Sequence, residues 1–66
     1  MSLDKSELIW IASKMHSKGY SGDDIRYSDD LNGNEDQFDD VNNYMDELNA
    51  IGEIAFYEKY KEYKLY

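Results

Sequence analysis

The sequence F-D-D-V-N-N-Y-M-D-E-L-N-A-I-G, residues 38–52, carries the pattern that decides the fold. Four of its apolar residues recur at the spacing of one face of an α-helix: Phe38, Val41, Met45 and Leu48. Gly52 follows at the position where a glycine commonly ends a helix, because glycine adopts a positive φ without strain. Asn34 is the expected N-cap, with Gln37 three residues later as in a capping box. This segment therefore predicts an amphipathic helix.

The residues before this segment predict two further helices. Asp4 and Glu7 have the spacing of a capping box, and Gly19 ends the first helix. Its inward face is formed by residues at helical spacing: Leu8, Ile11, Ala12 and Met15. Ile9 and Trp10 are left turned partly away. We expect Trp10 to cover the C-terminal hairpin or tail, and the alternative is an exposed tryptophan that anchors an interface. Ser21 and Asp24 repeat the capping pattern for a short second helix that runs to about residue 30.

The C-terminal residues 53–66, E-I-A-F-Y-E-K-Y-K-E-Y-K-L-Y, fit two structures. In a hairpin with a turn near residues 58–61, each strand places alternate residues on one face: Ile54 with Phe56, and Tyr63 with Leu65. In a helix, a different set shares a face: Phe56, Tyr60 and Tyr63. Aromatic content and alternation favour the hairpin, whereas the absence of a glycine at the turn favours the helix.

Residues 41–54, V-N-N-Y-M-D-E-L-N-A-I-G-E-I, resemble the end of the third helix and the start of the wing in winged helix-turn-helix proteins. The order in that family is an apolar residue, a leucine, a glycine and an aliphatic residue, which are here Met45, Leu48, Gly52 and Ile54. The resemblance, which is one of fold, implies an α+β fold of three helices followed by a C-terminal β-hairpin wing, in a single winged-helix-like domain over residues 1–66. The alternative is an all-α three-helix bundle.

The charge of the chain is strongly negative and concentrated in the middle. The formal net charge is −8. Residues 19–53 hold eleven acids and one base, whereas residues 1–18 and 54–66 each hold two acids and three bases. Such a surface repels nucleic acid and anionic membranes and attracts basic protein surfaces.

Residue types give little support to catalysis or to metal binding. The chain has no cysteine and one histidine, so it lacks the usual zinc and thiol–imidazole sets. When Gly33 is aligned with the glycine of an EF-hand loop, Ser28 falls where a carboxylate is wanted and Asp39 where a bidentate glutamate is wanted. We therefore predict no enzyme, no catalytic residue, no cofactor and no metal site.

The compartment follows from two expectations. We expect no leader and no membrane span, because no apolar run approaches about 20 residues. The expected location is the cytoplasm, which is that of the host cell if the chain is encoded by a phage.

The leading functional hypothesis is a non-catalytic acidic protein-binding module that docks on a basic protein surface. Its specific form is a phage or mobile-element inhibitor that occupies the nucleic-acid site of a DNA- or RNA-handling enzyme by DNA mimicry. The expected partner-binding residues come from the acidic middle of the chain: Asp29, Asp30, Asp36, Asp39, Asp40, Asn43, Tyr44, Asp46 and Glu47.

The alternative is a winged-helix DNA-binding transcriptional regulator, which the family resemblance implies. A dimer would fit this alternative, with the tail lysines on the phosphates. Direct nucleic-acid binding is disfavoured, because the outward face of the third helix would present carboxylates to a phosphate backbone of the same sign.

Overall fold

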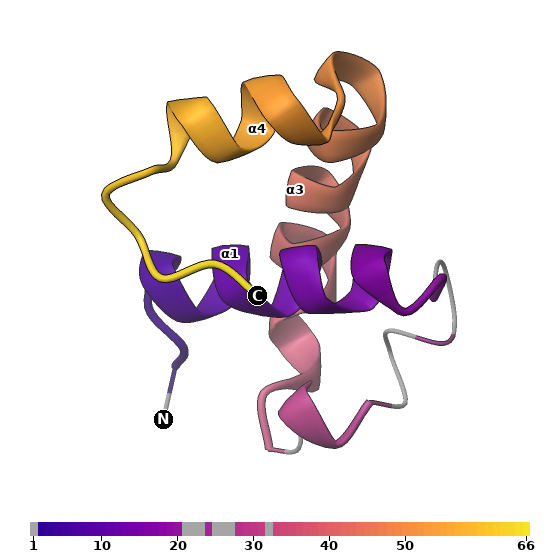
Figure 1. Cartoon of the computed structure of the whole chain (residues 1–66). Helices are drawn as coiled ribbons and strands as arrows, with labels where there is room; N and C mark the ends of the chain where they lie inside the picture. The colour runs from indigo at the N-terminus through magenta and orange to yellow at the C-terminus, as the bar shows by residue number, and fades with distance from the viewer. Residues whose placement is uncertain (1, 21–23, 25–27, 32) are drawn as a thin grey trace.

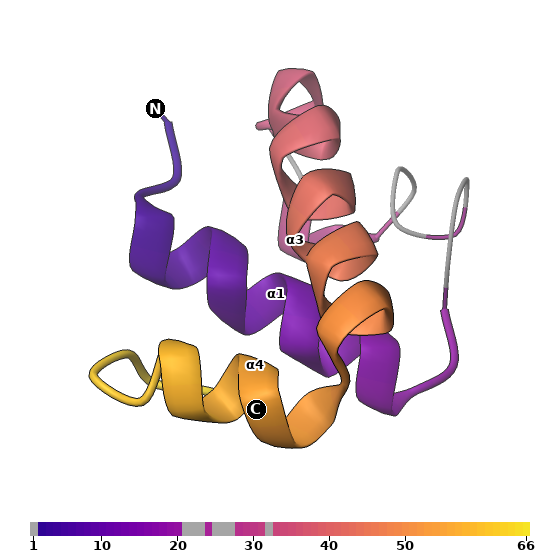
Figure 2. The ribbon, with the colours of Figure 1, turned by 90° about the horizontal axis from the view of Figure 1, so that it is seen from above.

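The computed structural model describes residues 2–20, 24, 28–31 and 33–66, which form a small helical domain (Figures 1 and 2). Its elements in chain order are α1 (Lys5–Ser17), the 3₁₀ turns η1 (Asp29–Leu31) and η2 (Glu35–Gln37), α3 (Phe38–Ile51) and α4 (Glu53–Lys59). Helix α1 crosses α3, and α4 folds back from the C-terminal end of α3 over α1. None of the helices in these residues is long and apolar enough to cross a membrane.

Both ends of α1 form as predicted. The Asp4 side chain accepts a hydrogen bond from the Glu7 amide at 2.9 Å and caps the first turn. Gly19, with φ of +78°, closes the other end. Its amide donates to the His16 carbonyl, and the Tyr20 amide donates to the Met15 carbonyl. These two bonds are those of a Schellman motif, which satisfies carbonyls that the end of a helix leaves free.

Helix α1 is buried on two sides. One side packs against α3 and η1 in a cluster of buried residues: Leu8, Ile11, Ala12, Met15, Leu31, Val41 and Met45. The other side packs in a second cluster: Ile9, Leu48, Phe56 and Tyr60. The expectation that Ile9 turns partly away from the core is wrong, because α4 supplies a second cover and Ile9 is fully buried.

Helix α3 buries its predicted stripe but begins differently from the prediction. Val41, Met45 and Leu48 are buried, and Phe38 packs against the cluster that contains Val41 and Met45. Asn34 precedes a 3₁₀ turn and makes no capping hydrogen bond with its side chain. The Gln37 amide contacts the backbone of Leu3 instead, accepting from its N–H at 2.7 Å and donating to its carbonyl at 3.0 Å. Gln37, predicted to complete a capping box, thus holds the N-terminal segment against the start of α3.

The predicted second helix falls largely on residues 21–23 and 25–27, which lie outside the described residues. Within this segment Asp24 is helical. The following residues 29–31 form η1, which buries Leu31.

The predicted C-terminal β-hairpin wing is wrong, because residues 53–59 form α4 and no strand occurs in the described part of the chain. Gly52, with φ of +88°, ends α3 by donating to the Leu48 carbonyl, and its own carbonyl accepts from the Phe56 amide. The predicted hairpin would place Tyr60 in the turn near residues 58–61, whereas the helix buries Tyr60 with Phe56 and leaves Glu58 exposed between them. The fold is therefore the all-α alternative.

The C-terminal tail returns across α1, as Figure 1 shows. The Tyr66 amide donates to Ser13 Oγ at 3.0 Å, and Ser13 Oγ donates to the Trp10 carbonyl at 2.9 Å. The fully buried Ser13 hydroxyl is thus satisfied on both sides. The rings of Tyr66 and Trp10 meet edge to face, with centroids 5.9 Å apart. Trp10 therefore covers the tail, as the sequence predicted.

We predict that Ile9→Val lowers the free energy of unfolding by about 1 kcal/mol, because it removes a buried methylene. The control is Ile54→Val, the same change at a position that is 89% exposed. It should cost less than about 0.5 kcal/mol. Urea unfolding followed by circular dichroism measures both. Equal losses at the two positions would contradict the burial of α1 on its second side.

Candidate functional site

The outer side of α3, together with the turn η2 before it, carries a surface that we call the acidic face: Asp36, Asp39, Asp40, Asn43 and Asp46. All five residues are exposed. Asp39, Asn43 and Asp46 follow one another at i, i+4 and i+7, on the side of α3 opposite its buried stripe. Five of the nine predicted partner-binding residues are thus exposed along α3 and the turn η2 before it.

The carboxylates of the acidic face are not neutralised within the described residues. The salt bridges there involve four other acids: Asp30, Glu47, Glu53 and Glu58. None of them involves Asp36, Asp39, Asp40 or Asp46. The negative charge of this face is therefore directed to solvent and to whatever approaches it.

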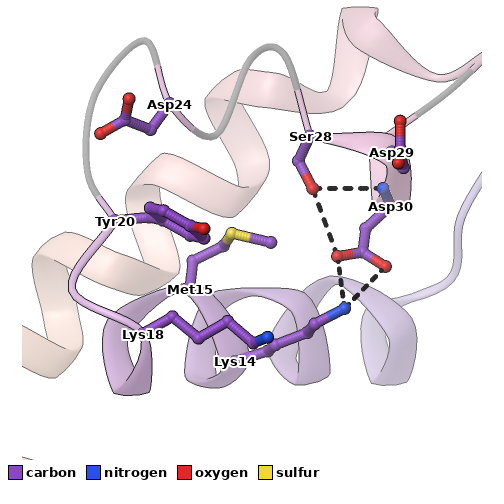
Figure 3. Close-up of a pocket in the computed structure, with 8 residues that line it drawn as sticks. All are labelled: Lys14, Met15, Lys18, Tyr20, Asp24, Ser28, Asp29 and Asp30. Carbon is purple, nitrogen blue, oxygen red and sulfur yellow. Dashed lines mark hydrogen bonds and ion pairs between the residues drawn. The ribbon is translucent and has the colours of Figure 1, made fainter.

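Asp30 is held by the fold, as Figure 3 shows. Lys14 Nζ on α1 donates to both carboxylate oxygens, at 2.9 and 3.2 Å, and Ser28 Oγ lies 3.2 Å from Oδ2. The ion pair is mostly buried, with side chains 22% and 23% exposed. Asp29 is exposed and points away from Lys14. Asp30 therefore attaches η1 to α1, whereas Asp29 stays available at the edge of the acidic middle.

Glu47 and Tyr44 lie between α3 and α4. The Glu47 carboxylate accepts hydrogen bonds from Lys59 Nζ and from the Tyr60 hydroxyl. The bond from Lys59, and then that from Tyr60, holds the pKa of Glu47 below its ordinary value. Burial, and then the bond to Glu47, raises the pKa of Tyr60. Tyr44 is half-buried and meets the Tyr60 ring edge to face at 6.0 Å. Both predicted contact residues thus hold the two helices together.

A surface cavity of about 430 Å³ opens beside the end of α1. Its lining mixes cationic, acidic, aromatic and apolar side chains: Lys14, Met15, Lys18, Tyr20, Asp24, Ser28, Asp29 and Asp30. The described residues contain no group of three or more histidines, cysteines or carboxylates placed to hold a metal ion. His16 is not part of this lining, and its Nδ1 lies 3.4 Å from Glu53 Oε1 without forming a hydrogen bond.

Sequence reasoning missed the lysines that hold Asp30 and Glu47. Lys14 lies 16 positions from Asp30, and Lys59 lies 12 positions from Glu47. Neither pair has the i, i+3 or i, i+4 spacing that marks a contact along one helix. Only the packing of α1 and α4 brings these charges together.

Comparison of the chain with protein-family models, with curated proteins and with solved structures finds no match in any of the three.

We predict that Glu47→Gln destabilises the fold at neutral pH and makes its stability less sensitive to acid. Because the pKa of Glu47 is lowered by folding, its carboxylate stabilises the fold above its ordinary pKa of 4.5. That stabilisation is lost as the pH falls through the lowered pKa.

Urea unfolding at a series of pH values from neutral to about 3 measures the effect. The difference between wild type and variant should shrink toward the acid end. Asp46→Asn, which changes an exposed carboxylate on the same helix, is the control and should shift the neutral-pH value by no more than about 0.5 kcal/mol. A difference for Glu47→Gln that stays constant across the series would contradict the lowered pKa.

Proposed function

We propose that this chain is a non-catalytic protein-binding module whose acidic face docks on a basic surface of a nucleic-acid-handling enzyme. Docked there, it occupies the site of the DNA or RNA and inhibits the enzyme. The observation that carries the proposal is the row of four exposed carboxylates along η2 and the outer side of α3, none of them in a salt bridge within the described residues.

The spacing of these charges supports a likeness to one DNA strand. Asp39 and Asp46 are seven residues apart on α3, which is about 10 Å along the helix. The three carboxylates over this length, with Asp40 between them, give about one charge per 5 Å. One strand of duplex DNA presents a charge about every 3.4 Å along the axis. A groove that binds a phosphate backbone therefore meets a comparable, somewhat sparser row of negative charge on α3.

The stability of α3 explains only part of this row. Asp39 and Asp40 lie in the first turn, where the helix dipole favours negative charge by about 0.3–1 kcal/mol. Asp46 lies two turns further along, beyond the reach of that effect. Its carboxylate is exposed and forms no salt bridge within the described residues, so folding gives it no evident role. An acidic docking surface accounts for all four.

A competition assay tests the proposal. A fluorescently labelled duplex is bound to each of several purified enzymes, including a restriction endonuclease, a DNA polymerase and an RNA-guided nuclease, and this chain is added at low salt. We predict that it lowers the anisotropy by releasing the duplex from at least one enzyme, and that added salt weakens the competition. The chain alone should leave the anisotropy of the free duplex unchanged.

The double variant Asp39→Lys/Asp46→Lys should compete at least about 30-fold more weakly, since losing two contacts of about 1 kcal/mol each costs about 2 kcal/mol and the new lysines also repel a basic surface. The matched control is Glu7→Lys/Glu62→Lys, which changes the net charge equally and also replaces one acid in the first turn of a helix. The control should compete like wild type.

Three results would count against the proposal. They are no release of duplex from any enzyme at low salt, equal losses in the two double variants, and direct binding of the free duplex by the chain. The last result would favour a DNA-binding protein.

A further inference from the structure

The corner between α3 and α4 carries apolar side chains that the fold does not bury in its core. Every residue from 50 to 55 is exposed. We call the four apolar ones the apolar corner: Ala50, Ile51, Ile54 and Ala55. Ile54 is 89% exposed and Ile51 is 43% exposed. Figure 1 shows this corner at the top right, where the chain turns from α3 into α4.

The exposure of Ile54 follows from how α4 packs. Gly52 starts α4, and Phe56 is directed into the core with Ile9 and Leu48. Residues two positions apart on a helix point in nearly opposite directions. Ile54 is therefore held away from the core by the burial of Phe56. A β-branched residue is also a weaker helix former than alanine or glutamate, so neither packing nor helix propensity explains an isoleucine here.

Carboxylates border the apolar corner. Asp46 lies one turn before Ala50 on the outer side of α3, and Glu58 lies one turn after Ile54 on α4. Glu53 directly precedes Ile54 in the chain. The Glu53 and Glu58 side chains remain 58% and 77% exposed despite their contacts with His16 and Lys61. An apolar centre with a polar rim is the usual anatomy of a protein interface.

The negative charge of this rim indicates which kind of partner fits the apolar corner. A second copy of the chain would bring like-charged carboxylates together around the same apolar centre, which opposes self-association. A partner with an apolar recess bordered by lysines or arginines would contact both the apolar residues of the corner and the carboxylates around them. Asp46 belongs to the acidic face as well, so the two surfaces are continuous on α3.

We infer that Ile54 is the apolar anchor that inserts into a recess with a basic border, on the same protein that the acidic face contacts. This inference rests on the proposed function and adds a specific contact to it. A nucleic-acid site that is occupied by charge alone needs no such anchor. The anchor would let the chain select one protein among many with basic grooves, since buried apolar contacts at the centre of an interface contribute most to affinity.

The competition assay, run with an enzyme that releases its duplex, tests the anchor. Ile54→Ser should weaken competition about tenfold, and by the same factor at low and moderate salt, because an apolar contact is not screened by ions. Asp39→Lys/Asp46→Lys should instead reduce the salt dependence. Tyr20→Ser is the control, since Tyr20 is 46% exposed on another part of the surface, and it should compete like wild type.

The outcomes separate the two proposals. If Ile54→Ser competes like wild type while Asp39→Lys/Asp46→Lys fails, the anchor is wrong and the acidic docking surface stands. If wild type releases no duplex from any enzyme, both proposals fall. If sedimentation equilibrium shows a wild-type dimer that Ile54→Ser converts to a monomer, the occupant is a second copy and the anchor for a basic partner is overturned.

Discussion

The fold depends on the burial of α1 on two sides at once. Its 13 residues contribute to both clusters of buried side chains, with α3 and η1 covering one side and α4 with the end of α3 covering the other. Each of these partners alone would leave an apolar side of α1 in water. The single-residue link at Gly52 lets α4 turn back at once, so one short chain provides both covers.

This packing also arranges the charge of the surface. Lys14 on α1 forms a salt bridge with Asp30, and Lys59 on α4 forms one with Glu47. Lys5 lies over the rings of Tyr60 and Tyr63, at 5.9 and 5.7 Å from their centroids. These cations are therefore held on the side of α1 and α4, and the outer side of α3 keeps its carboxylates uncompensated within the described residues. The acidic face thus stays negative because the packing of the helices places these lysines away from it.

Local patterns predicted what local geometry decides, and they failed where distant contacts decide. The Asp4 cap, the Gly19 and Gly52 ends and the buried stripe of α3 each depend on residues within about two turns, and all were predicted. The hairpin prediction was wrong. The spacing of Ile54 and Phe56 is that of one face of a strand, but the structure buries Phe56 against Ile9 and leaves Ile54 exposed. The sequence pattern does not show this long-range contact. The acidic face was visible from charge alone, whereas the internal contacts of Asp30 and Glu47 required the tertiary structure.

Solution NMR provides the most direct test that α4 folds back as a helix onto α1. The structure predicts sequential amide–amide nuclear Overhauser effects through residues 53–59, and effects between the Ile9 methyl groups and the Phe56 and Tyr60 rings. Cross-strand effects that pair residues 53–57 with residues 62–66, without contacts to Ile9, would show a hairpin. That result would remove the second cover of α1 and the placement of Lys59 on Glu47, and with them the division of charge on which the proposed function rests.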